Sequence, residues 1–386
     1  MSTPKKLNYH PNKTTNYLFC FLEVFTTEGG IQSYIQDILN AYEKLATKTN
    51  SIPKAQILLL RDTPTPPNLE HSKALKFYYL KTNPASLGRI KFTIKLIHLL
   101  IQEKPKMVFC GHIKLAPLIQ TICKFLAIPY TVITYGKEIW NPLTEREKKA
   151  LREADRIWTI SRYTRDRACK INHLDPQKFE ILPCTVNGNI FTPGPKPQSL
   201  IERYNLSNAK VLMTVARLWS GDIYKGVDVT IRALPLIAQV FPNVKYLVIG
   251  RGDDRTRLAK LAEDLGVEDR VIFAGFVAKE ELVEHYRVAD GYVMPSQEGF
   301  GIVYLEAIAC GLPVVAGDDD GSADPLQDGM LGWQVPYRDA VAVAAACVEM
   351  LRGEDRRCDR DWLREKTLTA FGTDTFLDRV KQLLNL

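Results

Sequence analysis

The segment EGFGIVYLEA, residues 298–307, places two carboxylates, Glu298 and Glu306, eight positions apart around a pair of glycines. It follows an apolar run ending in Pro-Ser and precedes ACGLPVV, which predicts a strand, a loop and then a helix. The backbone from Gly299 to Gly301 would lie at the helix N-terminus, where free N–H groups favour an anionic oxygen such as that of a diphosphate. Glu306 could reach a pair of sugar hydroxyls beside it. The plainer alternative is a flexible loop and a helix with one exposed acid.

Two cations follow the first strand expected in the second half of the chain. Arg217 and Lys225 belong to the segment VARLWSGDIYKGVD. At the same sheet edge as the glycine loop they would suit a diphosphate leaving group, with no metal needed to neutralise it. The alternative is a pair of solvated surface cations.

A glycine pair follows the first apolar run of the chain. Gly29 and Gly30, in TTEGGIQSYI, are expected to begin a helix where backbone could approach a phosphate. As a tight turn the pair would need no ligand.

Short apolar runs alternate with longer amphipathic ones along the chain, which predicts α/β architecture with parallel, helix-covered sheets. In the first half the expected strands are 17–24, 55–60, 75–80, 106–111, 130–134 and 156–161, and the helices 30–46, 87–103, 114–127, 142–154 and 162–172. In the second half the strands are 211–216, 244–250, 271–275, 291–295 and 313–317, and the helices 226–240, 254–265, 278–288, 302–310 and 338–352.

The segment TPGPKPQS, residues 192–199, is rich in Pro and Gly and is the expected linker between two doubly wound domains. Ligands of such sheets bind beyond the carboxyl ends of the strands, so we expect a cleft between the domains. An amphipathic stretch over 375–386 closes the chain.

Composition is that of a globular protein, with 46% hydrophobic and 25% charged residues and no apolar run long enough to cross a membrane. The first 15 residues are polar, lack a signal-peptide core and are expected to be a flexible leader. The eight cysteines are scattered and lie partly in apolar segments, which predicts reduced, buried thiols and a cytoplasmic protein.

Charge is distributed unevenly. Residues 1–195 contain 28 Lys and Arg against 15 Asp and Glu, whereas the remainder contains 23 against 29. A positive first half suggests an anionic partner, such as a membrane surface, an anionic substrate or nucleic acid. The apolar helix over 86–106 carries Arg89, Lys91 and Lys95; it could lie on an anionic membrane, but we favour a buried helix with a basic solvent edge.

These motifs, in this order and spacing, resemble those of the family-4 glycosyltransferases over nearly the whole chain. The resemblance rests on the GG loop, the R-L…Y-K-G segment, V-I-F-A-G-F, and E-x7-E followed by A-x-A-C-G-L-P-V-V. It implies the GT-B fold, in which two Rossmann-like domains face a central cleft. Residues 1–195 would form the acceptor-side domain, joined by a C-terminal helix over 372–386, and residues 196–371 the nucleotide-sugar-binding domain.

The resemblance implies retaining transfer of a hexosyl group from a nucleotide-diphosphate sugar to an acceptor hydroxyl in glycan, glycolipid or polysaccharide synthesis, with no cofactor or metal. Arg217 and Lys225 would hold the donor diphosphate. Glu298 would contact hydroxyls of the donor sugar, and Glu306 would bind the ribose. GDP-mannose and UDP-glucose are the donors to test first, and the Y-K-G-V-D region favours GDP-mannose.

Further contacts are implied around the donor. The backbone of Phe300, Gly301 and Ile302 would touch the sugar and phosphates. Phe276 and Val277, which follow the third strand of the second half, would lie near the nucleobase.

Gly29 and Gly30 would close over the diphosphate from the opposite domain, but the chain departs from the family pattern nearby. In VITYGKEIW, Tyr135 stands where a His is expected, and His112 in FCGHIK is the nearest histidine candidate. A lone His at a strand end is more often a satisfied polar group, so its role is open. The interval from Arg217 to Lys225 is also long, and WSGDIY is expected to form an excursion that influences donor or acceptor choice.

Other interpretations stay open. The acid clusters at 250–254 and 317–324 could bind a divalent metal, although an exposed acidic loop is the usual explanation. A GT-B relative with epimerase or phosphorylase chemistry, or a non-catalytic sugar-nucleotide-binding subunit, is the alternative function. The expected partners are a nucleotide-sugar donor and a glycan or lipid-linked acceptor, with possible peripheral contact at the inner membrane face and no nucleic acid.

Overall fold

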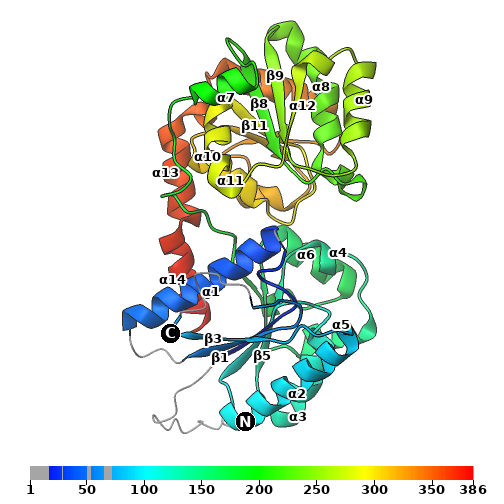
Figure 1. The fold of residues 1–386 in the computed structure, drawn as a ribbon, viewed down its shortest axis with the longest axis vertical. Helices are drawn as coiled ribbons and strands as arrows, with labels where there is room; N and C mark the ends of the chain where they lie inside the picture. The colour runs from blue at the N-terminus through cyan, green and yellow to red at the C-terminus, as the bar shows by residue number, and fades with distance from the viewer. Residues whose placement is uncertain (1–16, 28, 50–53, 65–71, 386) are drawn as a thin grey trace, which may run out of the picture.

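The computed structural model describes residues 17–27, 29–49, 54–64 and 72–385, so the predicted polar leader lies outside the described residues. Within these residues the chain forms two parallel sheets, each covered by helices, one above the other along the long axis in Figure 1. The predicted α/β class is confirmed, and the predicted strands are present with end shifts of up to three residues.

The first sheet has the order β3-β2-β1-β4-β5-β6-β7 in the described part of the chain, with every pair parallel. Its strands are β1 (Tyr17–Phe21), β2 (Ala55–Leu59), β3 (Leu75–Tyr79), β4 (Met107–Cys110), β5 (Tyr130–Thr134), β6 (Arg156–Thr159) and β7 (Phe179–Ile181). Strands β1, β2 and β5 are buried at every position, as their continuous apolar runs require.

The helices around this sheet are α1 (Gly30–Thr49), α2 (Ala85–Glu103), α3 (Ala116–Leu126), α4 (Lys137–Trp140), α5 (Glu145–Glu153) and α6 (Arg162–Asn172), with a 3₁₀ turn η1 (Pro176–Lys178). The helix predicted over 142–154 begins later, at Glu145. Thr144 caps it in a capping box with Glu147, and the separate short helix α4 precedes it.

The second sheet repeats the pattern, with the order β10-β9-β8-β11-β12-β13 and parallel pairs throughout the described residues. Its strands are β8 (Lys210–Val215), β9 (Val244–Ile249), β10 (Val271–Gly275), β11 (Gly291–Met294), β12 (Val314–Gly317) and β13 (Trp333–Val335). The helices are α7 (Gln198–Arg203), α8 (Val227–Val240), α9 (Arg255–Asp264), α10 (Lys279–Val288), α11 (Ile302–Ala309) and α12 (Ala340–Arg352), with 3₁₀ turns η2 (Ser220–Lys225), η3 (Glu268–Arg270), η4 (Gly321–Ala323) and η5 (Arg356–Cys358).

The end of the chain returns to the first sheet. Helices α13 (Arg360–Phe371) and α14 (Thr373–Leu383) run down one side of the molecule in Figure 1, and α14 packs against α1. The Tyr17 hydroxyl donates to the Leu384 carbonyl at 2.9 Å, and the rings of Tyr34 and Phe376 meet edge to face at 6.3 Å. Helix α14 therefore belongs to the layer that covers β1.

The two domains contact each other where α6 meets the turn η4. The Arg162 backbone N–H, at the start of α6, donates to the Asp324 carboxylate at 2.7 Å, and the Arg162 guanidinium pairs with both Asp324 and Asp328. At Gly299 an added methyl group would come within 2.6 Å of the Tyr135 carbonyl oxygen. Only glycine allows this close approach of the two backbones.

The interpretation of residues 86–106 as a buried helix with a basic solvent edge is wrong for the outer face. Phe92, Leu96, Leu99 and Leu100 of α2 are buried, as predicted. The outer face, however, is also apolar, with exposed side chains at Leu87, Ile90, Ile94, Ile97 and Ile101.

The cysteines, all of which lie in the described residues, are free thiols, and most are buried, as the sequence predicts. None of the helices in the described part of the chain combines the length and apolarity that crossing a membrane requires.

Candidate active site

The candidate site lies where the strand order of the second sheet reverses, between the neighbouring strands β8 and β11. Loops beyond the carboxyl ends of two such strands form a natural crevice for a ligand. The loop after β8 carries Arg217 and leads to Lys225, and the loop after β11 carries Glu298. The sequence thus brings all three residues to one sheet edge.

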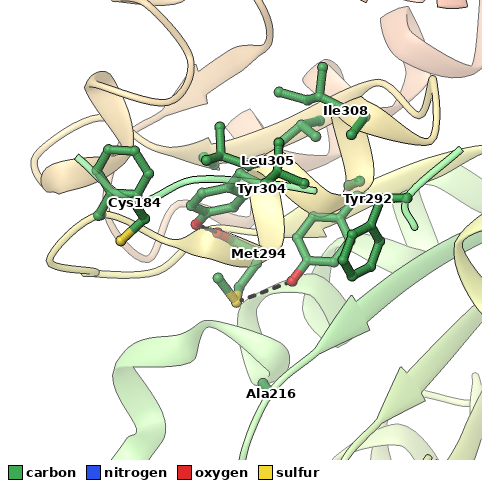
Figure 2. Close-up of a cluster of buried hydrophobic side chains, with 14 of the residues drawn as sticks. Cys184, Ala216, Tyr292, Met294, Tyr304, Leu305 and Ile308 are labelled. Carbon is green, nitrogen blue, oxygen red and sulfur yellow. Dashed lines mark hydrogen bonds between the residues drawn. The ribbon is translucent and has the colours of Figure 1, made fainter. Parts of the chain in front are cut away.

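Helix α11 is held firmly on strand β11. Figure 2 shows Tyr292 and Met294 of the strand packed with Tyr304, Leu305 and Ile308 of the helix. The Tyr304 hydroxyl donates to the Met294 carbonyl at 2.8 Å. Because these side chains are buried, the helix N-terminus has a fixed position next to the crevice.

The start of α11 matches the geometry predicted for a glycine loop. Gly301 is the N-cap residue with φ 87°, a conformation that favours glycine. The Phe300 side chain is buried and packs edge to face on Phe371, with ring centroids 5.8 Å apart. Phe300 therefore leaves only its backbone for a ligand, beside Gly301 and the partly buried Ile302.

Lys225 and Glu298 form an ion pair between the two loops. Their side chains are only 18% and 16% exposed. Burial alone would lower the pKa of Lys225, but the paired Glu298 carboxylate outweighs it and the pKa is raised. The Gln297 N–H also donates to the Tyr224 carbonyl at 3.0 Å, which ties the loops together. Lys225 is therefore charged and held at the glycine loop.

Arg217 is more exposed than Lys225. Its guanidinium lies 3.0 Å from the Asp222 carboxylate and 5.1 Å above the Trp219 ring centroid. The predicted excursion, residues 219–224, consists of Trp219 and the 3₁₀ turn η2 that follows it. The excursion therefore supplies the partners that hold the Arg217 side chain. It also lines one side of a shallow hollow, whose other side is formed by Asp254, Arg257 and Leu258 at the start of α9.

Lys137, at the start of α4 in the first domain, joins this cluster and was not predicted from the sequence. Its ammonium lies over the Tyr224 ring. Partial burial lowers the pKa of Lys137 to about 8; the cations of Lys225 and Arg217 act in the same direction, and the carboxylates of Glu298 and Asp222 oppose them. The cluster thus combines cations from both domains with two carboxylates, and an arriving anion would stabilise the charged form of Lys137.

Asp320 positions the Glu298 loop. Its buried carboxylate accepts the Glu298 N–H at 2.7 Å and the Ser322 N–H at 2.8 Å, and the Gly321 N–H donates to the Glu298 carbonyl at 2.8 Å. Burial raises the pKa of Asp320 to about 7. This acid belongs to the cluster at 317–324, which is one of the two candidate metal sites of the sequence.

Three of the other clustered acids are also engaged by the protein, whereas Asp318 and Asp319 are exposed. Asp324 pairs with Arg162, Asp253 accepts from Ser220, and Asp254 pairs with Arg257. Among the described residues, no group of three or more His, Cys, Asp or Glu side chains is arranged to hold a metal ion.

Glu306 lies in α11, partly buried, and accepts a hydrogen bond from the Tyr286 hydroxyl at 2.8 Å. Burial raises its pKa to about 7, against the opposing effect of Lys279. Asp37 of α1 shares this environment from the first domain. Its pKa is also raised to about 7, by burial and by the Glu306 carboxylate against Lys279.

The predicted nucleobase contacts follow β10. The Phe276 ring is exposed and lies under the Arg251 guanidinium, 4.6 Å from its centroid, while Val277 is partly buried against the core. A flat exposed ring backed by a guanidinium can stack on a base.

Gly30 begins α1, as expected for the glycine pair, and a Cβ added there would meet nothing within 4 Å. At Gly29 it would meet only the Gln32 side chain. Asp62, which the sequence did not single out, fixes the loop before them: its buried carboxylate accepts the backbone N–H groups of Val24, Phe25 and Thr26 at 2.7–3.0 Å.

Tyr135 and His112 are both engaged inside the first domain. The buried Tyr135 hydroxyl donates to the Gly111 carbonyl at 2.8 Å. Nδ1 of His112 accepts the Lys114 N–H at 3.0 Å, and burial with nearby Arg61 and Lys114 lowers the pKa of His112 to about 4. His112 is therefore a neutral imidazole near pH 7, and the hydroxyl of Tyr135 is engaged by the protein rather than free for a ligand.

Residues 209–353, which include β8, β11 and the loops of the site, match the family model described as glycosyl transferases group 1. The chain is 35% identical over 232 residues to the GDP-mannose-dependent alpha-(1-6)-phosphatidylinositol monomannoside mannosyltransferase of Mycolicibacterium smegmatis, covering 56% of this chain and 59% of that protein. The chain thus spans about three fifths of the length of the first curated relatives that it matches.

A longer alignment, at 26% identity over 343 residues, relates the chain to the GDP-mannose-dependent monoacylated alpha-(1-6)-phosphatidylinositol monomannoside mannosyltransferase of Corynebacterium glutamicum. It covers 85% of this chain and 87% of that protein.

Solved structures resemble the whole chain. Anabaena HepE in complex with UDP and glucose has a TM-score of 0.77 at 19% identity, covering 96% of this chain and 99% of that one. A glycosyltransferase from Rickettsia africae has a TM-score of 0.78 at 16% identity, covering 97% and 99%. At these identities the likeness establishes the fold alone, which is the predicted GT-B arrangement of two Rossmann-like domains.

Proposed function

We propose that this chain is a glycosyltransferase that moves a hexosyl group from a nucleotide-diphosphate sugar to an acceptor hydroxyl. The observation that carries the proposal is the cation cluster at the β8–β11 edge, where Arg217, Lys225 and Lys137 gather near Glu298 in the loop that leads to α11. Helix N–H groups and convergent cations are what a departing diphosphate needs. The mannosyltransferase relatives support the same activity.

In the proposed reaction the bond between the sugar C1 and the diphosphate oxygen breaks through an oxocarbenium-like state. The acceptor oxygen bonds to C1 on the same face, so configuration is retained, and the hydroxyl proton passes to the departing diphosphate. Lys225 and Arg217 stabilise the charge that develops on the leaving group, and Glu298 orients the sugar through its hydroxyls. Orientation and leaving-group stabilisation are the main contributions.

The donor that we favour is GDP-mannose and the acceptor class is a glycolipid or polysaccharide precursor, because the relatives are GDP-mannose-dependent mannosyltransferases of phosphatidylinositol monomannoside. A thermal-shift screen of GDP-, UDP- and ADP-sugars against the full chain would identify the donor. A ligand that binds the native state raises the Tm by mass action. We expect GDP-mannose to give the largest shift.

Product analysis then tests the reaction. With a lipid-extract acceptor, we expect release of nucleoside diphosphate that depends on the acceptor, together with a product whose anomeric configuration by NMR equals that of the donor. An epimerised nucleotide sugar without acceptor, release that requires inorganic phosphate, binding without turnover, or an inverted product would each overturn the proposal.

A further inference from the structure

Helix α2 presents a continuous apolar stripe to solvent. Along this helix of the first domain, Leu87, Ile90, Ile94, Ile97 and Ile101 are between 37% and 63% exposed. Their spacing of three and four residues places them on one side of the helix, within about 80° of arc and over about 21 Å of length. The face that packs on the sheet lies opposite, and its side chains are already buried.

A stripe of this length needs an explanation. Single exposed apolar side chains are ordinary, but contiguous ones mark an interaction surface. Helix α3, which packs against α2, carries a further exposed apolar side chain, Phe125, which is 89% exposed. Both helices lie at the end of the first domain remote from the second in Figure 1, away from the candidate active site.

The charges beside the stripe are mostly positive. Arg89, Lys91 and Lys95 are interspersed with the apolar positions of α2, whose one acidic residue is Glu103 at its end, and the exposed Lys104 and Lys106 come directly after the helix. Residues 1–195 as a whole contain 28 basic against 15 acidic residues. A second copy of the same face would therefore bring like charges together, whereas an anionic lipid surface is complementary in both charge and apolarity.

We propose that α2 docks this chain on an anionic lipid bilayer, with the stripe from Leu87 to Ile101 inserted at the interface and the basic residues beside lipid headgroups. A helix with an apolar face bordered by Lys and Arg lies in the interface plane rather than across it. The inference does not depend on the donor site, because no residue of the cation cluster takes part in it.

The test is flotation of the full chain with vesicles of phosphatidylcholine alone or with about one third phosphatidylglycerol. We expect binding to the anionic vesicles that weakens at high salt. Replacing Ile90, Ile94 and Ile101 by Gln should reduce that binding at least tenfold. The matched control replaces Leu236, Val240 and Val341 of the second domain, which are also exposed, by Gln and should bind like the parent chain.

Charge is tested separately. A variant with Gln in place of Arg89, Lys91 and Lys95 should also bind anionic vesicles at least tenfold more weakly. A control variant with Gln in place of Arg232, Arg255 and Lys260 of the second domain loses the same charge, and its binding should weaken less than threefold. Circular dichroism and titration with the donor nucleotide, both unchanged in the stripe variant, would show that the fold and the nucleotide site are intact.

Three results would overturn the proposal. The first is absence of parent-chain binding to anionic vesicles. The second is unchanged binding by the stripe variant. The third is a stable dimer in light scattering that becomes monomeric in that variant, which would show that a second copy covers the stripe.

Discussion

Lys137 gives the sharpest test of how the two domains share a ligand. In the ligand-free chain its pKa is about 8, because partial burial and the cations of Lys225 and Arg217 disfavour its charged form. A bound diphosphate would restore the pKa to at least the ordinary value of about 10.4. Binding then takes up a proton at pH values above 8. Nucleotide affinity should therefore be close to its maximum below about pH 7 and fall as pH rises through the free-state pKa.

The magnitude follows from the protonated fraction. A group of pKa 8 is roughly nine-tenths charged at pH 7 and one-tenth charged at pH 9, so affinity should fall by about tenfold across this interval. The side chain is exposed, so solvent screening reduces the effect. We expect a loss of about three- to tenfold.

The assay is isothermal titration of the full chain with GDP, and with UDP if the screen favours it, from pH 6.5 to 9.5. The Lys137→Met variant should bind more weakly at pH 7 and show a flat profile above that pH. Titration of the phosphate itself occurs near pH 6 and is common to both proteins. A parent profile that stays flat up to pH 9, or an equal slope in the variant, would refute the assignment of Lys137 to the diphosphate.

Three further changes are expected to separate chemistry, loop positioning and domain closure. Lys225→Ala should lower kcat for sugar transfer about 100-fold or more, because it removes one stabiliser of the leaving group; Lys210→Ala, at the opposite end of β8, should leave kcat unchanged, and equal rates would contradict the leaving-group role. Asp320→Ala should lower the free energy of unfolding, measured in urea, by about 2–4 kcal/mol, because two N–H groups lose their acceptor. Asp319→Ala, at the exposed neighbouring residue, should lower it by less than about 0.5 kcal/mol. Similar losses in both variants would argue against the loop-positioning role. Arg162→Ala should change stability by less than about 1 kcal/mol yet increase the radius of gyration in X-ray scattering, whereas Arg165→Ala on the same helix should not; an unchanged radius would show that this contact does not hold the domains together.

The sequence predicts the fold well because both halves follow simple rules. Buried parallel strands read as continuous apolar runs, and the helices between them as amphipathic ones. The elements that were missed lack that signal. Strands β7 and β13 have three residues each and lie at sheet edges, and α7 is a short helix behind the Pro-rich linker. Helix α13 was also missed, although it is long enough to be predicted from the sequence.

The candidate site was predictable in part. Arg217, Lys225 and Glu298 share a sheet edge because each follows a strand that lies at the reversal of strand order, and this reversal is typical of doubly wound sheets. The pairing of the two cations with carboxylates depends on side-chain packing, which the motif does not encode. Arg217 in particular faces Asp222 inside the excursion.

Residues whose role depends on a contact with a distant part of the chain could not be predicted from local patterns. Lys137 follows a buried strand and a glycine, which is the one signal that could have identified it. Its contact with Tyr224 depends on how the domains face each other. Asp320 was noticed only as part of an acidic cluster, because two hydrogen bonds to loop N–H groups leave no trace in composition.

The central claim is that a diphosphate lies between the N-terminus of α11 and the cations of the β8–β11 edge. Titration calorimetry of the full chain with GDP and guanosine, and with UDP and uridine, tests it most directly. The account predicts that one diphosphate binds at least tenfold more tightly than its nucleoside, and that Arg217→Ala abolishes most of that difference. Equal affinity for both nucleoside and diphosphate pairs, or a difference that Arg217→Ala leaves intact, would contradict it.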